Sequence, residues 1–142
     1  MKTSARNQFS GVVKDVILGS VNAEVLVELS GGEIIVASVT MESVTALGIK
    51  AGINVLALVK APQIILVTDF GGYKLSARNQ LTGKISGIIP GAVNSEIDIE
   101  LKGGQKIAAT VTNDSVSTLG LHKEQQVTAV FKAGAVLLAL PN

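Results

Sequence analysis

The sequence contains no cysteine, and this absence excludes several kinds of site. Disulfide bridges and thiolate metal sites both need cysteine, and one histidine cannot form an imidazole cluster around a transition metal. We therefore expect no bound metal cation. No apolar run approaches the roughly 18 to 20 residues of a membrane span, and the first residues lack the apolar core of a signal peptide. We expect a cytoplasmic protein with no membrane partner.

Aromatic residues and net charge are also scarce, at 3% of the chain and +1. Proteins that bind nucleic acids usually carry a basic surface for the phosphates, and those that bind single strands add aromatic side chains for base stacking. We therefore expect no nucleic acid as a partner. No nucleophile, general acid and general base occur together, and His122 is interpreted as a surface residue in a turn. The sequence favours a binding protein over an enzyme.

What the sequence does contain is an internal repeat. The block Ser4-Ala5-Arg6-Asn7-Gln8, termed the signature, returns unchanged as Ser76-Ala77-Arg78-Asn79-Gln80, and the rest of the two copies aligns without a gap. We divide the chain into a first module at residues 1–70, a connector at 71–74 and a second module at 75–142. A module of about 70 residues is marginal alone. Because 47% of the residues are hydrophobic, apolar surface should remain for a homo-oligomer.

The pattern of apolar residues predicts the same elements in each module. A first strand over residues 8–17, which contains Gly11 and is expected to have a bend or a bulge, is followed by a hairpin of two strands around a glycine pair. A short helix is expected over residues 41–47 and 113–119, between a threonine cap and a final glycine. Two further strands are expected at residues 55–60 and 64–67, with copies at 127–132 and 136–140. This order predicts an all-β protein of two five-stranded Greek-key barrels of the OB-fold type, with a small β-sandwich as the alternative.

The signature is polar, whereas packing alone would preserve only apolar character. In an extended segment alternate side chains project to one side, so Ser4 and Arg6 are expected to converge. A hydroxyl and a guanidinium both donate hydrogen bonds, and the planar guanidinium suits an oxyanion. The alternative is a polar first strand whose arginine pairs with a surface carboxylate. Both interpretations remain open on the residues alone.

The signature and the repeat behind it, which together cover nearly the whole chain, resemble the Mop domains of the molbindin family. Molbindins bind molybdate or tungstate. The resemblance implies an OB-fold for each module, trimers of the tandem chain, and intracellular molybdenum storage or homeostasis through oxyanion sites at interfaces between modules. The tandem arrangement, with no helix-turn-helix segment in front, is similar to cytoplasmic members of the family and differs from its DNA-binding regulators.

The resemblance also implies which residues bind the oxyanion. In the first copy they are Ser4, Ala5, Arg6, Lys60 and Ala61, with Thr40 from a neighbouring module; in the second they are Ser76, Ala77, Arg78, Lys132, Ala133 and Thr112. The family often has serine after the lysine, and the alanine found here leaves only a main-chain N–H at that place. Without the resemblance, Lys60 is as readily a solubilising edge residue, and Thr40 is more simply a helix cap. The Val21-Asn22 and Val93-Asn94 turns are an open candidate for a second kind of anion site.

Overall fold

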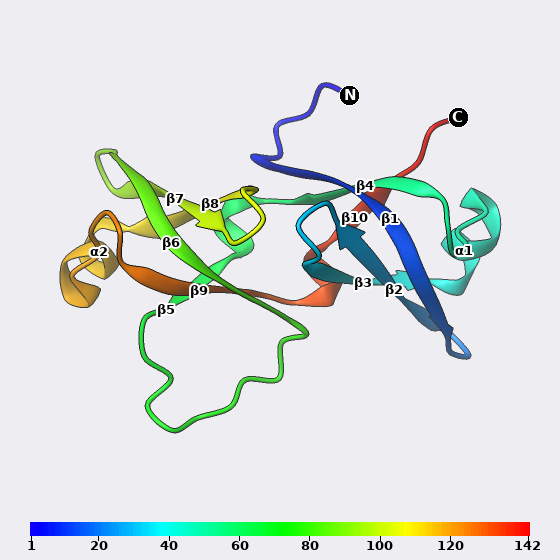
Figure 1. The fold of residues 1–142 in the computed structure, drawn as a ribbon, viewed down its shortest axis with the longest axis horizontal. Helices are drawn as coiled ribbons and strands as arrows, with labels where there is room; N and C mark the ends of the chain where they lie inside the picture. The colour runs from blue at the N-terminus through cyan, green and yellow to red at the C-terminus, as the bar shows by residue number, and fades with distance from the viewer.

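The computed structural model describes residues 1–142 as two β lobes that lie side by side, with the helices at opposite ends of the long axis (Figure 1). Each lobe contains a five-stranded antiparallel sheet and one short helix. In the first lobe β3 (Ile34–Thr40) packs against the single-turn helix η2 (Ala133–Ala135) of the second repeat. In the second lobe β8 (Lys106–Thr112) packs against η1 (Ala61–Gln63) of the first repeat. The prediction of an all-β protein with two five-stranded sheets and two short helices is confirmed.

The elements of the two repeats follow the same order. The first repeat contains β1 (Asn7–Leu18), β2 (Asn22–Leu29), β3 (Ile34–Thr40), α1 (Met41–Leu47), β4 (Asn54–Val59), η1 (Ala61–Gln63) and β5 (Ile65–Val67). The second contains β6 (Asn79–Pro90), β7 (Asn94–Leu101), β8 (Lys106–Thr112), α2 (Asn113–Leu119), β9 (Gln126–Phe131), η2 (Ala133–Ala135) and β10 (Leu137–Ala139). The single-turn helices η1 and η2 were not predicted from the sequence.

Local chemistry explains where the two helices begin and end. The Thr40 hydroxyl accepts a hydrogen bond from the Ser43 N–H at 3.1 Å, and Gly48 ends α1 in the left-handed region at φ 66°. Helix α2 has the same cap at Thr112 and the same ending at Gly120, with φ 59°. The cap hydroxyls are thus used within the chain. Neither helix has the length and apolar character needed to cross a membrane.

The fifth strand of each sheet comes from the other repeat. The strand orders are β10-β4-β1-β2-β3 and β5-β9-β6-β7-β8. Leu138 of β10 pairs with Ala57 of β4, and Leu66 of β5 pairs with Ala129 of β9. The boundaries at residues 70 and 75 therefore divide the sequence repeat, but neither repeat forms a five-stranded barrel from its own residues. Each lobe combines four strands of one repeat with the last strand of the other.

The two lobes also meet at their centre. One cluster of 25 buried apolar residues extends through both lobes. The hairpin turns of the two repeats touch so closely that a Cβ on Gly31 would lie 2.5 Å from the Cα of Gly103, which leaves room only for glycine. The Gly103 N–H donates to Glu33 Oε2 at 3.1 Å across this contact. The first glycine of each pair therefore serves the contact between repeats.

The bend of the first strand lies further along than Gly11. The register of β1 against β2 shifts between Val13 and Asp15, not at the glycine. Gly11 instead allows close packing, because a Cβ there would lie 2.6 Å from Cγ1 of Val27. The bulge predicted for the first strand is thus present. Gly11 does not form it; this glycine is needed for the close approach of the neighbouring strand.

Candidate functional site

Several predicted site residues surround one hollow, here termed the Ser4 hollow, of about 470 Å³. Ser4 and Ala5 line it from the segment before β1, and Lys60 lines it from the end of β4. Gly134 and Ala135 of η2 complete the wall, so the hollow contains residues of both repeats. Its remaining lining residues are Thr3, Leu58, Val59, Gln63 and Leu137. The exchange of the fifth strand is what brings η2 to this place.

Unpaired main-chain N–H groups lie in the same two segments. The N–H groups of Arg6, Lys60 and Ala61 make no hydrogen bond within the chain, although Ala61 is only 1% exposed. The N–H of Ala5 donates to Thr3 Oγ1 at 3.2 Å. Arg6 and Lys60 are exposed, so the argument from burial applies to Ala61 alone. Because buried N–H groups normally have a partner, its free N–H is consistent with a ligand that accepts hydrogen bonds.

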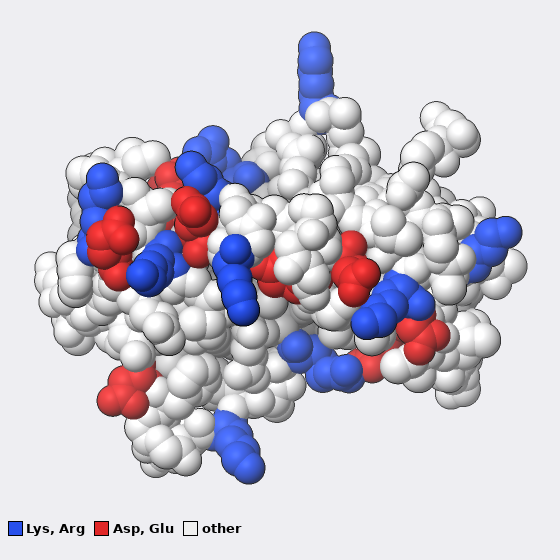
Figure 2. Space-filling view, viewed as in Figure 1, with Lys and Arg blue, Asp and Glu red and all other residues white.

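The chemistry of the Ser4 hollow is that of a donor site. It offers the hydroxyl of Ser4, the ammonium group of Lys60 and the amide of Gln63, and no carboxylate lines it. A site of this kind suits an anion that can only accept hydrogen bonds. The net charge of the chain is only +1, and lysine, arginine and acidic side chains are interspersed on the face shown in Figure 2.

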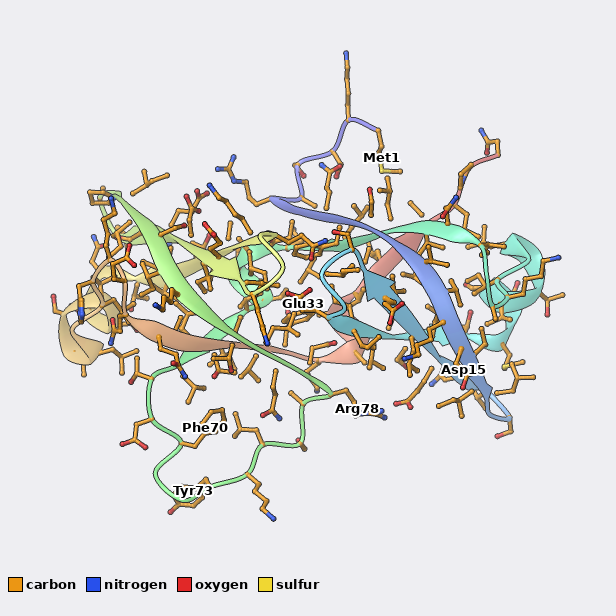
Figure 3. All side chains as sticks on the ribbon, viewed as in Figure 1. Met1, Asp15, Glu33, Phe70, Tyr73 and Arg78 are labelled. Carbon is orange, nitrogen blue, oxygen red and sulfur yellow. The ribbon has the colours of Figure 1, made fainter.

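The signature arginines do not line the Ser4 hollow. The Arg6 guanidinium binds Glu96 of the other repeat, with Nε and one terminal nitrogen 2.9 and 2.6 Å from Oε1. Arg78 pairs with Glu24 of the first repeat through one terminal nitrogen. Figure 3 shows Arg78 pointing from the start of β6 toward the other lobe. The predicted convergence of Ser4 and Arg6 side chains is absent because β1 begins only at Asn7, so strand alternation does not apply to residues 4–6.

Sequence reasoning missed the role of the signature asparagines. Asn7 and Asn79 are 2% and 0% exposed. Asn7 donates to Ala108 O at 2.8 Å and accepts from Ala108 N at 2.7 Å, across the boundary between the lobes. Asn79 makes the equivalent pair with Val36, both at 2.8 Å. The sequence did contain an indication of this role, because the asparagine occurs in both copies of the signature. In each copy it binds the backbone of the other repeat.

The remaining candidates lie elsewhere in the chain. Thr40 and Thr112 cap α1 and α2 and do not line the Ser4 hollow. Val21 and Val93 are each 71% exposed, and their carbonyl groups accept from the first N–H of α1 and of α2. The structure of one chain thus brings together Ser4, Ala5 and Lys60, and it places the two threonines outside this group.

The surroundings of the two arginines differ by one carboxylate. Asp98 lies two residues beyond Glu96 on β7, whereas the equivalent residue in the first repeat is Leu26. Partial burial raises the pKa of Asp98, and a hydrogen bond and repulsion from Glu96 raise it further, while the charges of Arg6 and Lys106 lower it. The surroundings of Arg6 therefore include a carboxyl group, that of Asp98, whose charged form is disfavoured.

We expect Asp98→Asn to stabilise the protein more at pH 7 than at pH 4. A carboxyl whose pKa is raised in the folded state favours folding while it is protonated, and this contribution is lost as the pH rises through the folded-state pKa. Removing the charge should therefore raise Tm relative to the wild type at pH 7, with a smaller difference at pH 4. Thermal melts of both proteins at the two pH values test this. An equal difference at both pH values would contradict it.

Comparison with known proteins places these features in context. The TOBE domain family matches residues 3–66 and again residues 75–138. The molybdenum transport protein ModE of Herbaspirillum seropedicae is 45% identical over 140 residues, covering 99% of this chain and 52% of ModE. The molybdenum-pterin-binding protein MopA of Rhodobacter capsulatus is 40% identical over 141 residues, with 99% and 53% covered. The chain spans about half the length of these curated relatives.

A solved structure matches the whole chain. It is that of the cytoplasmic molybdate-binding protein ModG with molybdate bound. The TM-score is 0.96 at 48% identity, and the match covers 99% of this chain and 100% of the ModG chain. The two-lobed arrangement is therefore shared with a protein whose crystals contain molybdate.

Proposed function

Because the chain belongs to the family of tandem TOBE-domain, Mop-type proteins, we propose that it binds molybdate and is not an enzyme. The observation that carries the proposal is the likeness to molybdate-bound ModG over the full length of both chains. The Ser4 hollow, which presents donors and no carboxylate, supports the same conclusion from the chemistry of its residues.

The charge state of the ligand explains why such a hollow suits it. Molybdate is fully deprotonated near neutral pH, so its four oxygens only accept hydrogen bonds. A set of hydroxyl, ammonium and main-chain N–H groups can satisfy it. Phosphate at this pH often retains a proton that needs an acceptor, and a site that has no carboxylate offers this proton only neutral acceptors, which disfavours phosphate. The proposed ligand is therefore molybdate, with tungstate as the chemically similar second oxyanion.

We propose two equivalent oxyanion sites, one in each repeat. The first site contains Ser4, Ala5, Arg6, Lys60 and Ala61, and the second contains Ser76, Ala77, Arg78, Lys132 and Ala133. Thr40 and Thr112, which cap the two helices and do not line the Ser4 hollow, would reach these sites from a neighbouring module. We therefore propose a trimer with oxyanions at interfaces, acting in cytoplasmic molybdenum storage or homeostasis.

Native mass spectrometry of the full chain, with and without molybdate, tests this proposal. We expect a trimer or a multiple of it, because exposed apolar residues such as Ile65 (62%) and Leu137 (66%) on the outermost strands favour association. Added molybdate should increase the mass by whole numbers of bound oxyanions, and added sulfate should not. A monomer that binds no molybdate would contradict the proposal.

We expect molybdate affinity to be nearly constant from about pH 6 to pH 8. The Ser4 hollow contains no carboxylate and no histidine, and hydroxyl, ammonium and main-chain groups do not normally titrate in this range. Isothermal titration at pH 6, 7 and 8 measures the affinity. A change above about tenfold, equal to about 1.4 kcal/mol, would show that a titrating group outside the assigned set contributes to binding.

A further inference from the structure

The signature arginines lie between the repeats in a crossed arrangement. Arg6 of the first repeat binds Glu96 of the second, and Arg78 of the second binds Glu24 of the first. Glu24 and Glu96 are equivalent positions of the two copies, so the same contact occurs twice. The two glutamates lie on β2 and β7, outside the residues that line the Ser4 hollow.

We propose that Glu96 and Glu24 are positioning residues for the oxyanion sites. Each carboxylate holds the side chain of the signature arginine of the other repeat and thereby fixes the position of that arginine's own main-chain N–H, which makes no hydrogen bond within the chain. The inference rests on the proposed function. In this arrangement the Arg6 guanidinium binds Glu96, and the groups that bind the oxyanion are the Ser4 hydroxyl and the Arg6 main-chain N–H.

The segment before β1 depends on side-chain contacts for its position. Residues 3–6 precede the first strand and make no backbone ladder. The contacts that hold them are the Ala5 N–H to Thr3 Oγ1 bond, a long hydrogen bond of 3.5 Å from the Gln8 side chain to the Ala5 carbonyl, the Arg6 pair with Glu96, and the buried amide of Asn7. Asn7 anchors the start of the strand, and Arg6, the residue directly after Ala5, pairs with the other repeat.

The geometry of the pair is consistent with a holding role. Two nitrogens of Arg6 share one oxygen of Glu96, and the Glu96 side chain is 18% exposed while that of Arg6 is 61% exposed. Exposed ion pairs usually contribute little to global stability. Ligand affinity is more sensitive than global stability to the loss of this pair. Apparent affinity falls in proportion to the fraction of chains whose segment 3–6 has the conformation that binds the ligand.

A charge exchange separates this role from direct contact of the guanidinium with the oxyanion. In Arg6→Glu/Glu96→Arg the ion pair is retained with its two ends reversed, and Asp98 would attract the guanidinium introduced beside it on β7. If the guanidinium of Arg6 bound the oxyanion, the introduced carboxylate would repel it and the exchange would not help. If the pair only holds the segment, the exchange should restore binding that Arg6→Glu alone has lost.

The experiment is a titration of the full-length variants with sodium molybdate. Glu96→Gln should weaken one class of site by about three- to tenfold, as expected if the competent conformation falls to roughly 10 to 30%. Arg6→Glu should weaken it at least as much, and the exchange should return it to within about threefold of the wild type. Glu100→Gln, on the same strand and without an ion pair to arginine, is the matched control and should bind normally.

The outcomes distinguish this inference from the proposed function. An exchange that binds no better than Arg6→Glu, or a Glu96→Gln variant that binds as tightly as the wild type, overturns the positioning role. Wild-type protein that binds no molybdate overturns the proposed function and the inference with it. If Arg6→Glu fails to fold, Glu24→Gln and the exchange Arg78→Glu/Glu24→Arg repeat the test at the second pair, with the same expected rescue.

Discussion

Deletion of residues 136–142 is expected to loosen the first lobe and to leave the second largely intact. This segment contains β10, which pairs with β4, and Val136, which is 2% exposed. Losing the burial of Val136 and of the half-buried leucines after it should cost roughly 3 to 6 kcal/mol. In amide hydrogen exchange, Leu56 to Leu58 of β4 should lose protection, although they lie far from the deletion in the sequence.

Leu66→Ala provides the matched control for this deletion. Leu66 lies on β5, is 7% exposed and pairs with Ala129 of β9. Truncating a buried leucine typically costs about 2 to 5 kcal/mol, so protection should fall in β9, which belongs to the other repeat. If the deletion exposes β9 and Leu66→Ala exposes β4, each repeat forms its own sheet and the exchange of strands is wrong.

Lys60→Ala is expected to weaken molybdate binding at one class of site by about ten- to 150-fold. A charge-assisted hydrogen bond to an oxyanion is worth roughly 1.5 to 3 kcal/mol, and this lysine supplies the only full positive charge among the residues that line the Ser4 hollow. Lys132→Ala should have the same effect at the equivalent site. Calorimetric titration should show about half of the sites lost near the wild-type midpoint in each variant.

The double variant and a surface lysine complete this test. Lys60→Ala/Lys132→Ala should lose binding at both kinds of site, whereas Lys123→Ala, in an exposed turn, should bind as the wild type does. Normal binding by Lys60→Ala would show that the lysine is a solubilising residue at a strand end, which is the alternative that the sequence left open.

The sequence predicts the local structure well where one residue determines it. Thr40 and Gly48 bound a helix at the expected residues, because a cap hydroxyl and a left-handed glycine act within one turn of the chain. Alternating apolar residues likewise place β2, since its valines face the core and its glutamates do not. The repeat then transfers each local prediction to the second copy.

Long-range choices could not be predicted from the same residues. Leu66 and Leu138 occupy equivalent positions and pair with equivalent alanines, so the sequence does not show which copy of the fifth strand joins which sheet. The direction of Arg6 depends on where β7 of the other repeat lies, which is itself a consequence of the strand exchange. Ser4, Ala5 and Lys60 lie together as predicted. The partner of Arg6, in contrast, could be identified only from the three-dimensional structure.

We propose that molybdate binds beside the signature of each repeat. Anomalous diffraction at the molybdenum absorption edge, from crystals of the full chain grown with molybdate, tests this most directly. We predict a molybdenum peak within hydrogen-bonding reach of the Ser4 hydroxyl, the Arg6 N–H and the Lys60 ammonium group, and an equivalent peak at Ser76, Arg78 and Lys132. Crystals with molybdenum bound only elsewhere, or with none bound, would contradict the claim.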